Sequence, residues 1–365
     1  MTRPSAPLST PTHSLLGLEL LRFACAISVL VWHYQHFFFV GGAPVNFEVT
    51  QQPLYGLLKP FYEAGWLGVQ AFWCLSGFIF FWKYAQPVSK GQVGARRFAV
   101  LRFSRLYPLH LATLLIVAAL AAWYRARQGV DYVYQHNDWP HFALQLFMAS
   151  DWPGRSEWSF NGPIWSISIE VLVYALFYAL SRLGMTRWWH VVGLIGAAGL
   201  VYALKLTPHP VVLCVFFFYL GALTHLAHEA LLRQPRLVRR AVLAAGLAAV
   251  GAGAWLLAAG KLKAMFYVAL LAPVMLLVLL DGVQPRSPRL VHLINALGNT
   301  TYASYLLHFP LQLLTANLVL SLGWHPPLQQ PAFLLGYLVL TFSLAAIVYR
   351  VLEMPAQAWL RARLR

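Results

Sequence analysis

Long apolar runs are the feature that most constrains what this chain of 365 residues can fold into. A run of about 20 apolar residues is long enough to cross a bilayer as a helix, and about ten runs approach that length. They are 15–40, 63–84, 99–123, 164–182, 188–205, 210–229, 240–260, 264–281, 299–321 and 330–352. The sequence therefore predicts an all-α fold, a polytopic membrane helical bundle of about ten transmembrane helices.

The composition supports the same class of protein. Hydrophobic residues make up 59% of the chain and charged residues 10%, whereas a soluble domain carries roughly a quarter charged residues. The apolar runs are continuous rather than alternating, which excludes a membrane β-barrel. The segment 139–149 is apolar but about half a span long, and it predicts a short re-entrant or interfacial helix. We expect one membrane domain over 15–352, with a cytoplasmic amino-terminal tail (1–14) and a cytoplasmic basic tail (353–365).

The net charge of +16 would indicate nucleic acid if it formed a basic patch on a soluble protein. In membrane proteins, however, Lys and Arg accumulate in cytoplasmic loops. When the amino terminus is placed in the cytoplasm, most of the basic residues fall in inner loops or at inner helix ends. We therefore predict that both termini are cytoplasmic and that nucleic acid is not a partner. The outer segments 41–62 and 124–163 are rich in Trp, Tyr, Pro, Asn and Gln, which suits a sugar-like ligand.

The first span carries three ionisable residues, Glu19, Arg22 and His33. Such residues usually face the bundle interior and mark a functional site. Arg22 and His33 are eleven residues apart, about three helical turns or 16 Å along one face. Glu19 lies one turn before Arg22, where it neutralises the guanidinium. The alternative is that Arg22 reaches inner headgroups and His33 packs against neighbouring helices.

Two arginines, Arg102 and Arg105, lie one turn apart where the third span begins at the inner side. Guanidinium groups match the geometry of phosphate oxygens, so this pair indicates a phosphorylated cytosolic ligand. The alternative, at even odds, is that both arginines contact anionic lipid headgroups and set the topology. In the second span, Ser76 and Gly77 lie among bulky aromatics and allow another helix or a ligand to approach closely.

The fourth and ninth spans carry the other polar candidates. Ser166 and Glu170 share a helix face, and Glu170 lies about 9 Å into the span, a depth similar to that of His33. A carboxylate and an imidazole that meet inside a bundle form an acid–base pair; a structural role for Glu170 is the alternative. In the ninth span, Ser304 and His308 lie on adjoining faces, although a histidine there is also typical of a satisfied core residue.

Six segments in this order resemble acyltransferase family 3, the integral membrane O-acyltransferases of bacterial glycans. They are RFACAISVLVWH, GVQAFWCLSGFIFF, RFSRLYP, WSISIE, YASYLLHFP and LEMP. Two segments depart from the family pattern. Gln70 and Ala71 replace the acidic and aromatic residues common after the Gly-Val of the second span, and Met354 replaces a common lysine. The chain resembles the stand-alone type without an extracytoplasmic hydrolase-like domain. The resemblance implies a multi-pass protein of the bacterial inner (plasma) membrane.

The resemblance also implies roles for residues. His33 and Arg22 are expected to be essential for transfer, and Arg102 and Arg105 to hold the phosphates of an acyl-coenzyme A. Glu170, Ser304 and His308 are expected to line the reaction chamber. The candidate catalytic residues are His33, Arg22 and Glu170, and the candidate substrate-binding residues are Arg102, Arg105, Glu19, Ser76, Trp165, Ser166, Tyr302, Ser304, Tyr305 and His308.

The resulting prediction is an O-acyltransferase. Acyl-coenzyme A, with acetyl as the first expectation, is the co-substrate, and a hydroxyl of an extracytoplasmic or lipid-linked carbohydrate is the acceptor, with His33 as general base. An acyl-enzyme on Ser166 or Ser304 is less favoured. The alternative function is a proton-coupled transporter or lipid-linked glycan flippase that uses the same buried charges. We expect no tightly bound cofactor and no metal, because His33 with His36 and His225 with His228 lack further ligands. The pattern predicts no particular oligomeric state.

Overall fold

The computed structural model describes residues 15–154 and 157–363. Within these ranges, nine helices are long and apolar enough to cross a membrane, and Trp188–Ala203 is a shorter apolar helix of 16 residues. The predicted all-α bundle of about ten helices is thus confirmed. In chain order the elements are α1 (Leu16–Trp32), η1 (His33–Phe38), β1 (Phe39–Val40), β2 (Ala43–Pro44), η2 (Val49–Gln51), α2 (Tyr55–Ala64), η3 (Gly65–Leu67), α3 (Gly68–Phe80), η4 (Phe81–Ala85), α4 (Gln86–Ser89), α5 (Ala95–Gln128), α6 (Trp139–Leu146), η5 (Gly162–Ile164), α7 (Trp165–Arg182), α8 (Trp188–Ala203), α9 (Val211–Leu232), α10 (Arg236–Ala258), α11 (Ala264–Gly282), α12 (Pro288–Leu322), α13 (Pro331–Val348), η6 (Tyr349–Glu353) and α14 (Met354–Arg363).

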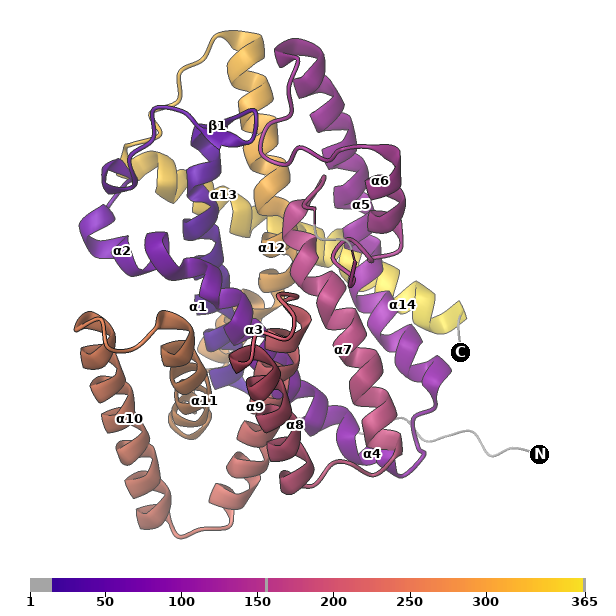
Figure 1. Cartoon of the computed structure of the whole chain (residues 1–365), viewed down its shortest axis with the longest axis vertical. Helices are drawn as coiled ribbons and strands as arrows, with labels where there is room; N and C mark the ends of the chain where they lie inside the picture. The colour runs from indigo at the N-terminus through magenta and orange to yellow at the C-terminus, as the bar shows by residue number, and fades with distance from the viewer. Residues whose placement is uncertain (1–14, 155–156, 364–365) are drawn as a thin grey trace.

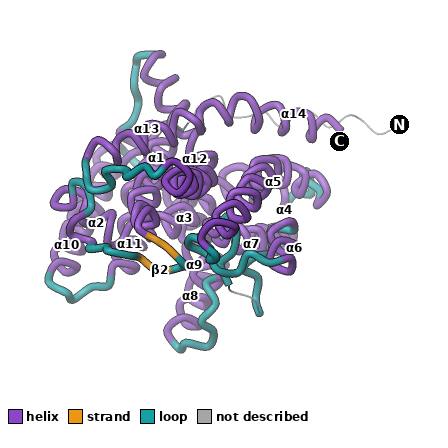
Figure 2. Tube along the Cα trace, turned by 90° about the horizontal axis from the view of Figure 1, so that it is seen from above, coloured by secondary structure: helices purple, strands orange, loops and turns teal. Residues whose placement is uncertain are grey.

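Helices α1 and α12 form the centre of the bundle. They pack against each other, and α12 also packs against α5 and α13. Figure 2 shows α1, α3 and α12 in the middle, with α10 and α11 on one side and α5, α6 and α7 on the other. Residues far apart in the sequence are therefore brought together along α12.

Helices α3 and α9 cross at a pair of glycines. A Cβ on Gly77 would lie 1.7 Å from the carbonyl oxygen of Phe218, and a Cβ on Gly221 would lie 1.7 Å from the carbonyl oxygen of Cys74. Small residues let helix backbones approach this closely in membrane proteins. The close approach expected at Gly77 is therefore made by a helix of the same chain.

Helices α10 and α11 form a hairpin at the edge of the bundle (Figure 1). Large apolar side chains on α10 remain exposed, including Leu237 at 80% and Trp255 at 64%. Because α10 adds few buried residues to the protein core, its apolar surface is matched to lipid rather than to water. This arrangement is that of a multi-pass membrane protein.

The segment between α5 and α7 contains α6, a helix of eight residues that is too short to span a bilayer. The predicted short helix is therefore present. Pro140 occupies its first turn, and Asp138 caps its amino terminus by accepting a hydrogen bond from the backbone N–H of His141 at 3.0 Å. The helix is held on α5 because His110 Nε2 donates a hydrogen bond to the carbonyl oxygen of Gln145 at 2.7 Å.

The two expected tails differ in what can be described. The tail over 1–14 lies outside the described residues. The tail after 352 continues α13 through a π-helical turn, Tyr349–Glu353, into α14, which is described to Arg363. Residues of this turn and of α14 contact α5, so the carboxy-terminal segment is positioned beside Arg102 and Arg105.

Candidate functional site

His33 lies where the regular α1 helix gives way to the 3-10 helix η1, and its side chain is buried. Its Nδ1 is 2.8 Å from the carbonyl oxygen of Val29. A carbonyl oxygen can only accept, so Nδ1 carries the proton and the neutral ring presents its Nε2 lone pair. Within the described residues, Nε2 has no hydrogen-bond partner. The hydrogen bond to Val29 therefore holds His33 in the tautomer whose Nε2 can accept a proton.

Two further histidines surround His33. Its ring centroid lies 4.7 Å from that of His308 on α12 and 5.0 Å from that of His36 on η1. Each neighbour also donates through Nδ1, His308 to the carbonyl oxygen of Tyr305 at 2.7 Å and His36 to Oε1 of Gln312 at 3.3 Å. Nε2 of His308 is buried without a partner in the described part of the chain. This histidine cluster, His33, His36 and His308, has basic nitrogens left free for a ligand.

Gln312 connects the histidine cluster to a third helix. Its amide nitrogen donates to the carbonyl oxygen of His33 at 2.8 Å and to the hydroxyl of Tyr337 on α13 at 3.2 Å. The sequence reasoning missed both Gln312 and His36 as members of the site. The spacing could have indicated Gln312, because this polar residue follows His308 by one helical turn within an apolar span.

The amino-terminal end of α7 meets α12 beside the cluster. Ser166 and Tyr305 share a hydrogen bond of 2.7 Å between their hydroxyl oxygens, and the Tyr305 hydroxyl also lies 2.8 Å from the carbonyl oxygen of Pro163. The ring of Tyr305 lies 5.9 Å from that of His308. Two predicted binding residues, Ser166 and Tyr305, are thus in contact next to the histidines.

Two other predicted binding residues are placed by packing. Trp165 lies edge-on to the ring of Trp73 on α3, with ring centroids 5.8 Å apart. Ser304 is buried and donates within its own helix to the carbonyl oxygen of Thr301 at 3.2 Å. Both positions are consistent with a structural contribution to the walls of the site.

Glu170 does not meet His33 among the described contacts. Its carboxylate instead interacts with the hydroxyls of Ser76 and Tyr174, which lie 3.5 Å apart, and with the charge of Arg102. Glu170 and Ser76 were predicted separately, and the structure joins them. The expected acid–base pair of Glu170 with His33 is not formed, because the inward face of α7 directs Glu170 toward α3.

A polar stripe on α7 runs inward from Ser166. Ser166, Glu170 and Tyr174 are spaced by four residues, so they lie on one face and span about 12 Å along the helix. At its inner end, the Tyr174 ring stacks on Phe80 with a centroid separation of 4.3 Å. The guanidinium of Arg102 lies 4.9 Å from the Phe80 ring centroid. The stripe therefore links the neighbourhood of the histidine cluster to that of Arg102.

Arg22 bridges α1 and α12 near the amino-terminal end of α1. Its guanidinium donates to Glu19 at 2.8 Å and to the hydroxyl of Thr301 at 2.9 Å. A Cβ on Gly298 would lie 1.9 Å from Oε2 of Glu19, so only glycine leaves room for this carboxylate. The Glu19–Arg22 pair expected from the spacing is formed, and no described contact joins Arg22 to His33.

Arg105 forms an ion pair with Glu353, whose side chain is 1% exposed. The guanidinium also lies over the Tyr302 ring, 5.2 Å from its centroid, and the Tyr302 hydroxyl donates to the carbonyl oxygen of Leu106 at 2.5 Å. Arg105 thus ties α5 to α12 and to the turn before α14. Its charge is compensated within the protein.

Arg102 is held differently from Arg105. Its Nη2 donates to the Tyr84 hydroxyl at 2.5 Å, and the guanidinium lies 4.8 Å from the Tyr84 ring centroid. No carboxylate in the described ranges forms an ion pair with Arg102. Lys83 and Arg361 lie close enough to Arg102 for its positive charge to repel theirs. Because Glu353 neutralises only Arg105 in this neighbourhood, the net positive charge of the four side chains favours an anion. We call Lys83, Arg102, Arg105 and Arg361 the basic cluster.

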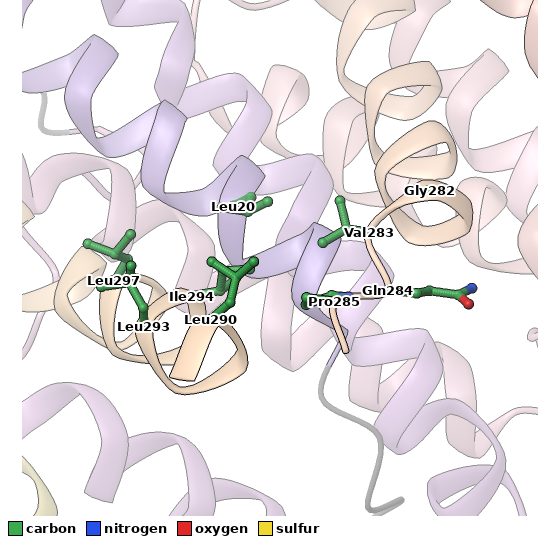
Figure 3. Close-up of a pocket in the computed structure, with 9 residues that line it drawn as sticks. All are labelled: Leu20, Gly282, Val283, Gln284, Pro285, Leu290, Leu293, Ile294 and Leu297. Carbon is green, nitrogen blue, oxygen red and sulfur yellow. The ribbon is translucent and has the colours of Figure 1, made fainter. Parts of the chain in front are cut away.

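An open cavity of about 570 Å³ lies between the amino-terminal parts of α1 and α12 and the segment that follows α11 (Figure 3). Its walls are mostly apolar, and its lining residues are Leu20, Gly282, Val283, Gln284, Pro285, Leu290, Leu293, Ile294 and Leu297. None of the candidate catalytic or binding residues lines it. The cavity therefore does not coincide with the histidine cluster or with the basic cluster.

The segment between α5 and α6 contacts the histidine cluster at His36. The Tyr132 hydroxyl donates to the carbonyl oxygen of His36 at 2.5 Å. The Tyr134 ring lies 5.9 Å from that of His36 and 4.8 Å from that of Phe309. Residues 132–134 therefore pack against the histidine cluster on the side of His36.

Comparison with known proteins gives one family and one relative. A family model described as an acyltransferase domain, acyltransferase 3, matches residues 15–350. The chain is also similar to the acyltransferase MdmB of Streptomyces mycarofaciens, with 30% identity over 190 residues, which are 50% of this chain and 44% of that protein. The similarity thus spans less than half of the relative's length. No solved structure matches the chain.

Proposed function

This chain belongs to acyltransferase family 3, and we propose that it transfers an acyl group, acetyl in the first instance, from acyl-coenzyme A to a carbohydrate hydroxyl. The acceptor is an extracytoplasmic or lipid-linked glycan. The observation that carries the proposal is the tautomer of His33, because its Nδ1 is committed to Val29 and its Nε2 is free. A buried neutral imidazole with a free Nε2 is suited to accept a proton.

In the proposed reaction, Nε2 of His33 takes the proton from the acceptor hydroxyl. The acceptor oxygen attacks the thioester carbonyl carbon, and the negative charge moves to the carbonyl oxygen. When that charge returns, the carbon–sulfur bond breaks. The coenzyme A sulfur leaves with the proton from the His33 imidazolium, and the ester remains on the acceptor. The products are an O-acyl carbohydrate and free coenzyme A, and His33 returns to its neutral form.

The basic cluster supports a phosphorylated donor on the inner side. Arg102 carries a charge without a carboxylate partner, and aromatic rings hold its guanidinium in place. Guanidinium groups bind phosphate oxygens in bidentate fashion. We assign the phosphates of acyl-coenzyme A to Arg102 first. Arg105 contributes less free charge, because Glu353 already neutralises it.

The two clusters are connected along α7 and α12. On α12, Tyr302 contacts Arg105 and His308 contacts His33. Tyr302 and His308 are about 9 Å apart along the axis of α12. A pantetheine arm that starts at the basic cluster would run along this wall toward the histidines. In this scheme Glu170 and Ser76 line the path of the donor, and Tyr305 with Ser166 lies beside the reacting carbonyl.

The scheme also places the protein in the membrane. We propose that it resides in the bacterial inner membrane with both termini in the cytoplasm, so that the basic cluster meets cytosolic acyl-coenzyme A. The outer segments that cover His36 then face the compartment of the carbohydrate acceptor. Protease protection of tags fused to each terminus in sealed vesicles tests this orientation.

The activity is tested by free-thiol release in detergent. The purified protein is given acetyl-coenzyme A and longer acyl donors with a panel of bacterial glycans, alongside the His33→Ala variant. A matched control is His325→Ala, because His325 is an exposed histidine between α12 and α13. Glycan-dependent thiol release by wild type and His325→Ala, and its loss in His33→Ala, is expected. If folded wild-type protein neither binds nor turns over any acyl-coenzyme A, the proposal is wrong and transport becomes the function to test.

A further inference from the structure

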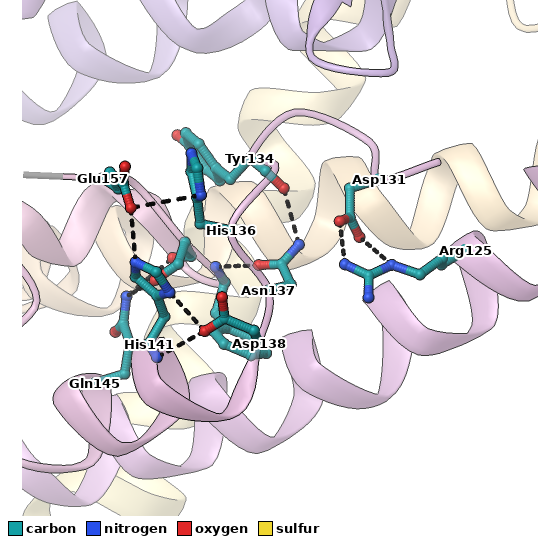
Figure 4. Close-up of polar contacts among 11 residues, drawn as sticks. Arg125, Asp131, Tyr134, His136, Asn137, Asp138, His141, Gln145 and Glu157 are labelled. Atoms are coloured by element: carbon teal, nitrogen blue, oxygen red, sulfur yellow. Dashed lines mark hydrogen bonds and ion pairs between the residues drawn. The ribbon is translucent and has the colours of Figure 1, made fainter. Parts of the chain in front are cut away.

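A second group of histidines lies in the segment between α5 and α7, away from the histidine cluster. His136, His141 and Glu157 each offer one ligand atom, and these atoms all lie within 4.8 Å of one another. Nε2 of His141 is 3.3 Å from Oε2 of Glu157, and Nδ1 of His136 is 3.6 Å from the same oxygen. Figure 4 shows the three side chains converging.

These separations match a tetrahedral zinc site. Zinc binds imidazole nitrogen and carboxylate oxygen at about 2.0–2.1 Å, so two ligand atoms of a tetrahedron lie about 3.4 Å apart. The two separations that involve Glu157 are close to this value. Two histidines and one glutamate form a ligand set that leaves one position open for water.

The imidazole of His141 is oriented as in known zinc proteins. Its Nδ1 lies 2.6 Å from Oδ1 of Asp138, which fixes the proton on Nδ1 and leaves Nε2 as the ligand atom. A carboxylate that accepts from a ligating histidine orients the ring and raises its basicity. The same Asp138 oxygen caps α6, so His141 is held by both its backbone and its side chain.

We propose that His136, His141 and Glu157 bind one zinc ion, with Asp138 as the carboxylate that positions His141. The sequence alone indicated no metal, because the spacing of these residues matches no familiar zinc motif and Glu157 comes from a different part of the loop. The site is independent of the proposed acyl transfer. No member of it touches the histidine cluster or the basic cluster in the described contacts.

The zinc ion would fasten the segment that covers the histidine cluster. Tyr132 and Tyr134 contact His36, and His136 lies two residues after Tyr134. Glu157 lies in the part of the same loop that follows α6. It is close to Ser159, whose carbonyl oxygen accepts a hydrogen bond of 2.9 Å from Gln145 on α6. Zinc therefore joins both arms of the loop to α6.

The test is direct metal binding. Full-length protein is purified in detergent without a histidine tag, stripped with a chelator, and titrated with Zn²⁺ by calorimetry. Bound metal is then counted by elemental analysis after desalting. The variants are His136→Ala, His141→Ala, Glu157→Gln and Asp138→Asn, with His325→Ala as the control histidine. Loading with Co²⁺ gives a visible spectrum that reports the coordination geometry.

We expect one Zn²⁺ per chain in wild type and in His325→Ala, with nitrogen and oxygen ligation. The three ligand variants should lose the bound ion, and Asp138→Asn should weaken affinity by about 10–100-fold, the usual effect of removing such a partner. Stripping the metal should also increase proteolysis of the loop around 129–161. The proposal is overturned if wild type retains no zinc, or if the ligand variants retain as much as His325→Ala.

Discussion

His33 donates its Nδ1 hydrogen bond to the carbonyl oxygen of Val29 across 2.8 Å, one turn earlier on the same helix. This bond is local, so it forms as soon as α1 folds and does not depend on a ligand. It fixes both the tautomer and the direction of the ring. The tautomer and orientation of the proposed general base are therefore fixed by a hydrogen bond to the backbone four residues earlier, and not by a partner carboxylate.

The first prediction concerns His33 itself. His33→Ala should lower the rate of glycan-dependent thiol release by about 10²–10⁴-fold, the usual contribution of a positioned general base. The bundle should remain folded, because within residues 15–154 and 157–363 the hydrogen bond of this imidazole goes to the backbone oxygen of Val29 and joins no other helix. Size-exclusion profile and unfolding midpoint in detergent report folding. Wild-type turnover in a well-folded His33→Ala protein would remove His33 from the mechanism.

The second prediction separates Arg102 from its neighbours. Arg102→Ala should raise KM for acyl-coenzyme A by at least tenfold with a smaller effect on kcat, since a lost charge-assisted bond to phosphate is worth about 1.5–3 kcal/mol. Arg96→Ala is the matched control, because Arg96 is an exposed arginine at the start of the same helix. Dephospho-coenzyme A donors would show which phosphate is held. An equal change in KM for both variants would contradict a specific site.

The third prediction uses the asymmetric burial of an ion pair. Glu353 is 1% exposed at its side chain and Arg105 is 24% exposed. Arg105→Ala leaves a carboxylate buried without its partner, which destabilises by about 3–5 kcal/mol. Glu353→Ala leaves an arginine that can still reach solvent or an anion, so its unfolding midpoint should fall less. The double variant should be more stable than Arg105→Ala alone. A smaller loss for Arg105→Ala than for Glu353→Ala would show that burial does not govern this pair.

The sequence predicted those parts of the site that depend on one helix at a time. The Glu19–Arg22 pair and the shared face of Ser166 and Glu170 follow from helical periodicity, which is fixed by the backbone. The family resemblance added the order of the motifs. For the same reason, the number and approximate ends of the spans follow from apolar length.

The contacts that the sequence did not predict are those determined by how the helices pack against one another. Glu170 was expected near His33 because the two residues lie at similar depths in their spans. Depth along a span, however, does not determine which neighbouring helix the residue faces. Packing turns Glu170 toward Ser76 on α3 and brings Gln312 on α12 to His33 instead. Such contacts join residues that lie far apart in the sequence, and no periodicity within one span encodes them.

The fourth prediction tests the crossing of α3 and α9. Gly77→Ala places a methyl group against the carbonyl oxygen of Phe218, where backbone on both sides prevents relief. Overpacking of this kind costs about 1–3 kcal/mol or more, so the unfolding midpoint in detergent should fall clearly. Gly251→Ala on α10 is the control, because nothing lies within 4 Å of its added Cβ. An unchanged midpoint for Gly77→Ala would mean that this crossing is looser than described.

The fifth prediction concerns pH and Asp151, which lies in the turn after α6 and is buried. Burial raises the pKa of its carboxyl group, and the nearby charge of His209 opposes this only in part. Because the pKa in the folded protein is raised above the unfolded value of about 3.9, the folded state holds this proton more tightly. The stabilising contribution is therefore complete below that pH and is lost as pH rises through the folded pKa.

Asp151→Asn, which carries no charge at any pH, should consequently unfold at a higher midpoint than wild type at pH 7. The difference between the two proteins should shrink as the pH falls through about 3.9, because below that value Asp151 becomes protonated in both states. Glu48→Gln controls for the loss of one negative charge, because Glu48 is exposed in the segment 41–62. Unfolding curves of all three proteins across this range decide the matter. A pH-independent difference would show that Asp151 acts through its shape and hydrogen bonds and not through its charge.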